Sequence, residues 1–251
     1  MTMNVSKRSA PLALAGLLAL TLTACGGGGG GGGASNAAVP PAPVATSFPV
    51  QQGLAYAFTH GLQSTLTVSG STTNGSTTYP LTGTLTYSLG AVVNATFNGA
   101  AVQQATETIN GTISGNGTTS PLTTSSQLYV NAQYTPVGSY EAGAYCVANS
   151  TAAYPATATA GQAGDLASFS CYTDSTKRTL TSTQKITYVT TAGSDGSSLD
   201  FQMLSNIYDA ANKSLGSTGT TYTISAAGIP KLTRIQLTET VGGISFTIDA
   251  K

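Results

Sequence analysis

The side chains able to carry acid–base chemistry are few and lie far apart along the chain. His60 is the only histidine, and a general base that works near neutral pH is most often a histidine. No G-x-S-x-G nucleophile motif accompanies it. Its place before Gly61 indicates the end of a strand. His60 is therefore a candidate base for a hydrolase, beside the simpler interpretation of a hydrogen-bonded turn residue.

Carboxylate pairs are a second source of chemistry, because two such groups can hydrolyse a glycosidic bond. The chain carries three glutamates and six aspartates, most of which we expect singly in turns: Glu107, Glu141, Glu239, Asp165, Asp174, Asp195, Asp200, Asp209 and Asp249. Asp195 and Asp200 could approach each other around a calcium ion, but the ligand spacing of an EF-hand loop is absent. A hydrolase would need His60 or two carboxylates to meet in a cleft. The sequence predicts no metal site and no cofactor.

Tyrosines are distributed unevenly, and they suggest a binding face. Six of the twelve crowd one segment: Tyr129, Tyr134, Tyr140, Tyr145, Tyr154 and Tyr172. A tyrosine has an apolar body and a polar tip, which suits both ligand stacking and cross-strand packing. Tyr134, Tyr140 and Tyr145 are the candidate binding residues. The absence of tryptophan counts slightly against a carbohydrate site.

The composition is typical of a β-sheet protein whose strands are half-exposed and which has few charged residues. Only 7% of the residues are charged, against about 25% in an average soluble protein. Without Lys7 and Arg8, seven basic residues face nine acidic ones. No basic patch exists, so nucleic acid is not an expected partner.

The first 25 residues have the order of an export signal. Lys7 and Arg8 precede an uncharged apolar run over 10–22. This run is too short to span a membrane, but it has the length of the apolar core of a signal peptide. The residues Leu22-Thr23-Ala24-Cys25 resemble the lipobox of bacterial lipoproteins. The resemblance implies a signal peptide over 1–24, and a diacylglyceryl group and an N-acyl chain such as palmitate on Cys25. Gly26 in place of aspartate implies the outer membrane, with the lipid anchor as the contact to the bilayer.

A tether is expected between this anchor and the folded domain. Residues 26–47 are rich in Gly, Pro and Ala and carry no charge. Such a chain cannot bury enough apolar surface to offset the cost of ordering it. We therefore expect a disordered tether over 25–47 and a single domain over 48–251, with 48–148 and 165–251 as its two halves.

The other two cysteines are expected to form a disulfide. With Cys25 lipidated, Cys146 and Cys171 are an even pair in an oxidising compartment. Both lie in segments with the character of strands, joined by a long connection over 149–164. A disulfide would make these strands neighbours in one sheet or place them face to face across the core. A metal or redox site is the alternative, against which the lack of C-x-x-C and the single histidine count.

Apolar residues alternate with polar ones from Leu54 onward, which predicts strands with one buried face. Asn-Gly or Asp-Gly pairs predict tight turns at 74–75, 98–99, 110–111, 116–117 and 195–196. Three further segments begin with a tyrosine and predict turns capped by Asn131, Asp174 and Asp209. No window after the signal shows a convincing helical stripe of ten or more residues.

The pattern as a whole predicts an all-β fold. We expect an antiparallel meander of about ten to thirteen strands that closes as a barrel or half-barrel, or stacks as a β-sandwich. The functional expectation is a non-enzymatic structural or binding role in the cell envelope, with another envelope protein, a glycan or an apolar ligand as partner. A carrier with an apolar ligand in a cavity of several hundred Å³ is the alternative, and a hydrolase is the third.

Overall fold

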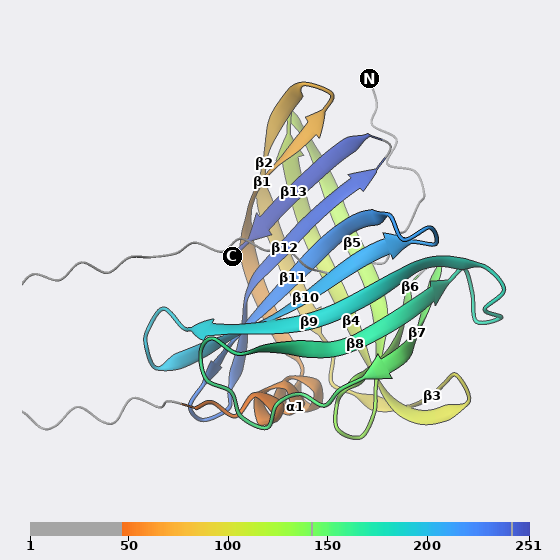
Figure 1. Ribbon diagram of the computed structural model, residues 1–251. Helices are drawn as coiled ribbons and strands as arrows, with labels where there is room; N and C mark the ends of the chain where they lie inside the picture. Colours follow the sequence, from red (N-terminus) through yellow and green to blue (C-terminus); the bar gives the residue numbers. More distant parts are fainter. Residues whose placement is uncertain (1–46, 142, 242) are drawn as a thin grey trace, which may run out of the picture.

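The computed structural model describes residues 47–141, 143–241 and 243–251. The predicted signal peptide, Cys25 and the tether up to residue 46 lie outside them. The described chain forms one helix and thirteen strands (Figure 1). In chain order these are α1 Val50–His60, β1 Leu62–Asn74, β2 Thr77–Leu89, β3 Val93–Phe97, β4 Ala100–Gly115, β5 Thr118–Val130, β6 Pro136–Glu141, β7 Ala144–Thr151, β8 Ala163–Tyr172, β9 Leu180–Ala192, β10 Ser198–Asp209, β11 Ser214–Ser225, β12 Pro230–Val241 and β13 Ile244–Ala250.

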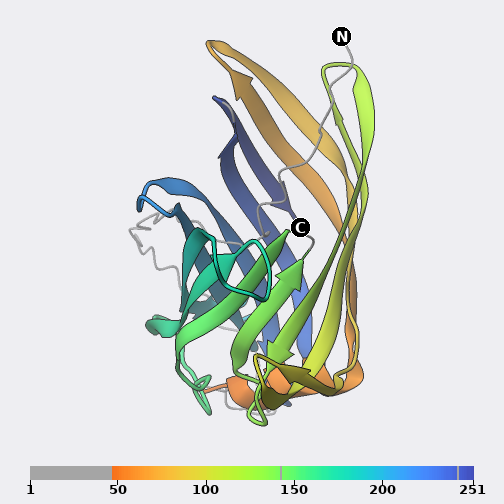
Figure 2. The same ribbon diagram turned by 90° about the vertical axis from the view of Figure 1, so that its right-hand side faces the viewer.

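Twelve of the strands close into an antiparallel barrel. From β4 to β13 each strand pairs with the next one, and β13 pairs with β1, which pairs with β2. The pairing of β2 with β4 closes the ring, and β3 stays outside it as a hairpin partner of β4. At the end opposite α1, the β1–β2 and β4–β5 hairpins project beyond the other strands (Figure 2). The predicted all-β meander is confirmed, in its closed form.

Four of the five predicted tight turns lie at or beside the predicted pairs. The first is displaced by one residue, because Asn74 ends β1 and pairs with Thr77 of β2, so residues 75 and 76 form the turn. Asn98-Gly99 and Asn116-Gly117 are two-residue hairpin loops in which both residues have positive φ. The turn predicted at Asn110-Gly111 is wrong, because both residues lie inside β4. A glycine is required there for a different reason, since a Cβ on Gly111 would lie 2.0 Å from the carbonyl oxygen of Thr84 on β2.

The three longer turns are capped as the sequence predicted. The side chains of Asn131, Asp174 and Asp209 each accept a hydrogen bond from the backbone amide two residues further on. The residue three positions after each cap has positive φ; these residues are Tyr134, Lys177 and Asn212. The Asx cap and the left-handed residue together reverse the chain after β5, β8 and β10.

Helix α1 was not expected from the sequence, and it packs into one end of the barrel. Its buried apolar residues, Val50, Leu54, Ala57 and Phe58, fall at helical spacing, so a short stripe was present. Gly53 allows the close approach, because a Cβ there would lie 3.1 Å from Ile224 Cγ2 of β11. Within the described residues no helix is long and apolar enough to cross a membrane.

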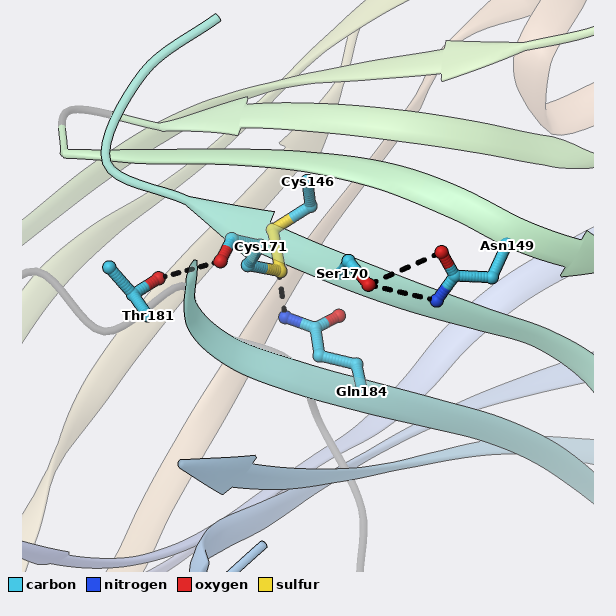
Figure 3. Close-up of a disulfide and its surroundings, with 6 residues drawn as sticks. All are labelled: Cys146, Asn149, Ser170, Cys171, Thr181 and Gln184. Atoms are coloured by element: carbon cyan, nitrogen blue, oxygen red, sulfur yellow. Dashed lines mark hydrogen bonds between the residues drawn. A yellow bond between two sulfur atoms is a disulfide. The ribbon is translucent and has the colours of Figure 1, made fainter. Parts of the chain in front are cut away.

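Cys146 on β7 and Cys171 on β8 form the predicted disulfide (Figure 3). They are direct partners in the antiparallel register, so the expectation that their strands are neighbours in one sheet is also confirmed. The Cα atoms lie 3.9 Å apart, closer than the usual 4.4–6.8 Å. Both side chains are buried, and the bond joins the two strands on either side of the long connection over 152–162.

Candidate functional site: a cavity inside the barrel

A cavity of about 170 Å³ lies inside the barrel, between α1 and the strands. Leu54, Ala57 and Phe58 of α1 form one wall. The opposite apolar wall comes from several strands and includes Leu89, Leu128, Val130, Leu166, Phe169, Ile186 and Met203. Most of the lining is therefore hydrocarbon, as in many sites for small ligands.

One part of the cavity wall is polar and is centred on Glu107. The Ser126 hydroxyl on β5 donates a hydrogen bond of 3.0 Å to the Glu107 carboxylate on β4. The hydroxyl groups of Tyr87 on β2 and Tyr222 on β11 lie 3.4 Å apart. Glu141 on β6 lines the same cavity, and all five residues except Tyr222 also line a second cavity of about 30 Å³. Two carboxylates, two phenols and a serine hydroxyl, from five strands, thus meet at one place in an otherwise apolar interior.

Strand alternation explains how Glu107 comes to face inward. It lies between buried Ala105 and Ile109 on β4, at the same period of two. Ser126 is its direct partner on β5, and Gln127 pairs with Tyr140. Glu141 on β6 therefore comes next to Ser126 in the same row. The expectation that most of the carboxylates lie in turns is wrong for Glu107, which lies inside β4. The alternation from 105 to 109 was the signal for its inward position.

Burial changes the protonation chemistry of this cluster. Desolvation raises the pKa of Glu107, and hydrogen bonds from Tyr87 and Ser126 offset part of that rise. Desolvation also raises the pKa of Tyr87 and of Tyr222 well above the usual value for a phenol. Both phenols therefore keep their protons at neutral pH, whereas Glu107 is a carboxyl group whose raised pKa favours its protonated form.

The raised pKa of Glu107 predicts a pH-dependent cost in stability. The folded state binds a proton that the unfolded state has lost, so stability decreases as pH rises from about 4.5 through the folded-state pKa. Glu107→Gln keeps an acceptor for Ser126 and removes the charge. We expect it to raise the melting temperature at pH 7, with a gain that shrinks toward pH 4. Thermal unfolding followed by circular dichroism from pH 4 to 7 measures this.

Asp165→Asn provides the matched control for that measurement. Asp165 pairs with Lys185 at 3.0 Å on the outside of the barrel, and both side chains are exposed. An exposed ion pair contributes at most about 1 kcal/mol, so this variant should follow the wild-type melting curve at each pH. A Glu107→Gln gain of equal size at pH 4 and pH 7 would contradict the assignment of a buried carboxylate.

His60 does not take part in this cavity. It is the last residue of α1, not the end of a strand, and it is exposed. Its ring stacks on Tyr56 with centroids 4.1 Å apart, and Nδ1 lies 2.8 Å from Thr59 Oγ1. The structure therefore places the only histidine of the chain on the outer surface of the helix.

The three candidate tyrosines lie at two separate places. Tyr140 and Tyr145 are direct cross-strand partners on β6 and β7. Tyr140 is 43% exposed, whereas Tyr145 is buried against Phe97 of β3, with centroids 4.9 Å apart. Tyr134 packs on Phe58 of α1 instead. None of the three lines the cavities described above.

Two open grooves lie on the outer wall. One, of about 500 Å³, runs along β7 to β10, and the other, of about 400 Å³, lies between β3 and β7. Some of the polar side chains of the larger groove are already paired with each other, as in the hydrogen bond of Ser150 with Ser168 and the ion pair of Asp165 with Lys185. The inner cavity, in contrast, combines an apolar wall with the buried polar side chains of Glu107 and Ser205. It is therefore the stronger candidate site.

Comparisons with models of protein families, with curated proteins and with solved structures give no match to this chain. In the part of the chain that the structure describes, no three side chains from His, Cys, Asp and Glu converge as a metal site would require. The barrel fold is compatible with a binding or carrier role. The cavity provides an apolar wall and a polar group of side chains around Glu107 for such a role.

Proposed function

We propose that this protein is a lipid-anchored carrier of the bacterial envelope, and that its barrel holds a small molecule with an apolar body. The observation that carries the proposal is the cavity beside α1, which is apolar over most of its wall and polar at Glu107. Protein interiors normally pack at the density of organic crystals. A barrel with a purely structural role would have this space filled by side chains.

The cavity limits the size of the ligand. Its volume of about 170 Å³ is below the several hundred Å³ that the sequence-based carrier hypothesis required, so only a smaller ligand than that hypothesis assumed can fit. An apolar cavity of about 150 Å³ is sufficient for benzene. The ligand that fits without rearrangement is therefore of that size, or is one short chain of a larger molecule.

Titration with 1-hexanol, followed by NMR, tests the binding role. We expect saturable binding to the wild type, and binding at least about tenfold weaker in Ala57→Leu and Ala167→Leu, which fill the cavity from α1 and from β8. Ala101→Leu, at an exposed position on β4, is the matched control and should bind like the wild type. The absence of saturable binding to the wild type would refute the carrier, as would unchanged affinity in both cavity-filling variants when they are folded.

The lipid anchor is the second part of the proposal, and it rests on the sequence Leu22-Thr23-Ala24-Cys25. Cells fed with labelled palmitate should label the wild type and leave Cys25→Ser unlabelled. The serine variant should also leave the membrane fraction. Retention of Cys25→Ser in the membrane would contradict the anchor without touching the carrier role.

The geometry of the cavity favours a carrier over a hydrolase. Glu107 and Glu141 line one cavity, and the strands that hold them are two sheet spacings apart, or about 10 Å. A glycosidase places two carboxyl groups on either side of a sugar. A cavity of about 170 Å³, which is near the size required for benzene, does not admit two linked sugar rings between them.

A further inference from the structure

Glutamates and aspartates lie on different sides of the barrel wall. All three glutamates of the chain occupy inward positions: Glu107 and Glu141 line the cavity, and Glu239 continues the inward row of Ile235 and Leu237 on β12. The aspartates lie in turns or on the outer face, where Asp165 and Asp249 pair with Lys185 and Arg234.

Glu107 has no positive side chain among the residues that surround it in the two cavities. In the described part of the chain the lysines, Arg178 and His60 are exposed, and Arg234 donates two hydrogen bonds to Asp249 on the outer face. Neither cavity is lined by a lysine, an arginine or a histidine. An ionised carboxylate in such surroundings is costly unless a cation comes to it.

Ser205 gives an independent sign that a hydrogen-bond partner is missing from the cavity. Its side chain on β10 is 4% exposed and lines the cavity. Within the described structure its hydroxyl oxygen has no hydrogen-bond partner. A buried polar atom of this kind normally has one, supplied by the protein, by water or by a ligand. The site therefore offers a hydroxyl as well as a carboxylate toward the same space.

We propose that the cavity binds a small primary amine whose apolar body has about six to eight carbon atoms, with its ammonium group at Glu107. This inference rests on the proposed carrier function and specifies its ligand class. An ammonium group has three donors and no acceptor. The Glu107 carboxylate and hydroxyl oxygens such as those of Ser205 and Tyr222 can accept from it. The apolar body then lies against Leu54, Phe58 and Met203.

Ligands of other charge fit this site less well. A carboxylate would bring a second negative charge beside Glu107, and the cavity lining holds no lysine, arginine or histidine to offset it. A neutral alcohol can use the hydrogen bonds but leaves the carboxylate without a cation. Hydrogen bonds to charged groups contribute about 1.5–3 kcal/mol, so an amine should bind more tightly than an alcohol of the same shape.

The test compares hexylamine, 1-hexanol and hexanoate at pH 7 in NMR titrations of the full-length protein. For the wild type we expect hexylamine to bind at least tenfold more tightly than 1-hexanol, and hexanoate to bind more weakly than either. Glu107→Gln should weaken hexylamine binding by about 10- to 100-fold and change 1-hexanol binding by less than about threefold. Glu239→Gln removes an inward carboxylate that does not line the cavity, and should leave hexylamine binding within about threefold.

The outcomes separate the ligand class from the carrier role. If 1-hexanol binds as tightly as hexylamine, the amine specificity is wrong and the carrier role stands. If Glu107→Gln and Glu239→Gln weaken hexylamine equally, the effect is that of overall interior charge, and the assignment to Glu107 is wrong. If none of the three compounds binds in a saturable way, the carrier proposal itself fails.

Discussion

Leu54→Ala is expected to lower the free energy of unfolding by about 2–5 kcal/mol, the usual cost of removing a buried leucine side chain. Leu54 is 2% exposed and packs with the main core of the barrel. Its loss would also enlarge the cavity that it lines. Urea unfolding followed by far-UV circular dichroism gives the difference from the wild type.

Tyr56→Ala is the control for that result, because Tyr56 lies on the same helix and is 41% exposed. Exposed substitutions usually change stability by about 0.5 kcal/mol or less. Equal and small losses for the two variants would show that α1 does not pack into the barrel. The account of a barrel end closed by α1 would then be wrong.

Loss of the disulfide is expected to lower the free energy of unfolding by about 3 kcal/mol. Cys146 and Cys171 are 25 residues apart in the chain, and closing a loop of that length removes this much freedom from the unfolded state in the chain-entropy model. The Cys146→Ser/Cys171→Ser variant and the reduced wild type should melt at the same temperature, below that of the oxidised protein.

Reductant provides the internal control for this prediction. It should lower the melting temperature of the wild type and leave that of the double variant unchanged. Titration of the native protein without reductant should find no free thiol at these two positions. Two reactive thiols there would contradict the bond.

Much of the fold could be predicted because its signals are local. Alternation along a strand places side chains on one face or the other, and this identified the strands and the antiparallel meander but left a barrel, a half-barrel and a β-sandwich open. The turn caps Asn131, Asp174 and Asp209 were predictable because an Asx side chain bonds to its own backbone two residues on. The disulfide was predictable because Cys146 and Cys171 are an even pair once Cys25 is set aside.

The errors came from features that depend on residues far apart. Asn110-Gly111 has the composition of a turn, but the neighbouring β2 strand requires a glycine at that position. Ring closure depends on the pairing of β2 with β4, past the intervening β3. Helix α1 is too short to be stable by itself, and it is stabilised only by packing its apolar stripe into the end of the barrel.

The cavity was less predictable than the fold. The sequence indicates that Glu107 shares a face with Ala105 and Ile109, and this could have identified an inward carboxylate. It does not indicate that Tyr87, Ser126 and Tyr222 come from three other strands to meet it. Their meeting depends on the register and closure of the whole barrel.

The central claim is that the barrel interior holds a small molecule, and intermolecular nuclear Overhauser effects test it most directly. In methyl-labelled protein saturated with hexylamine, we expect contacts from the alkyl protons to the methyl groups of Leu54, Leu166 and Met203, which surround the cavity. Contacts only to exposed methyl groups, such as those of Val93 and Ile229, or no contacts at saturation, would contradict the claim.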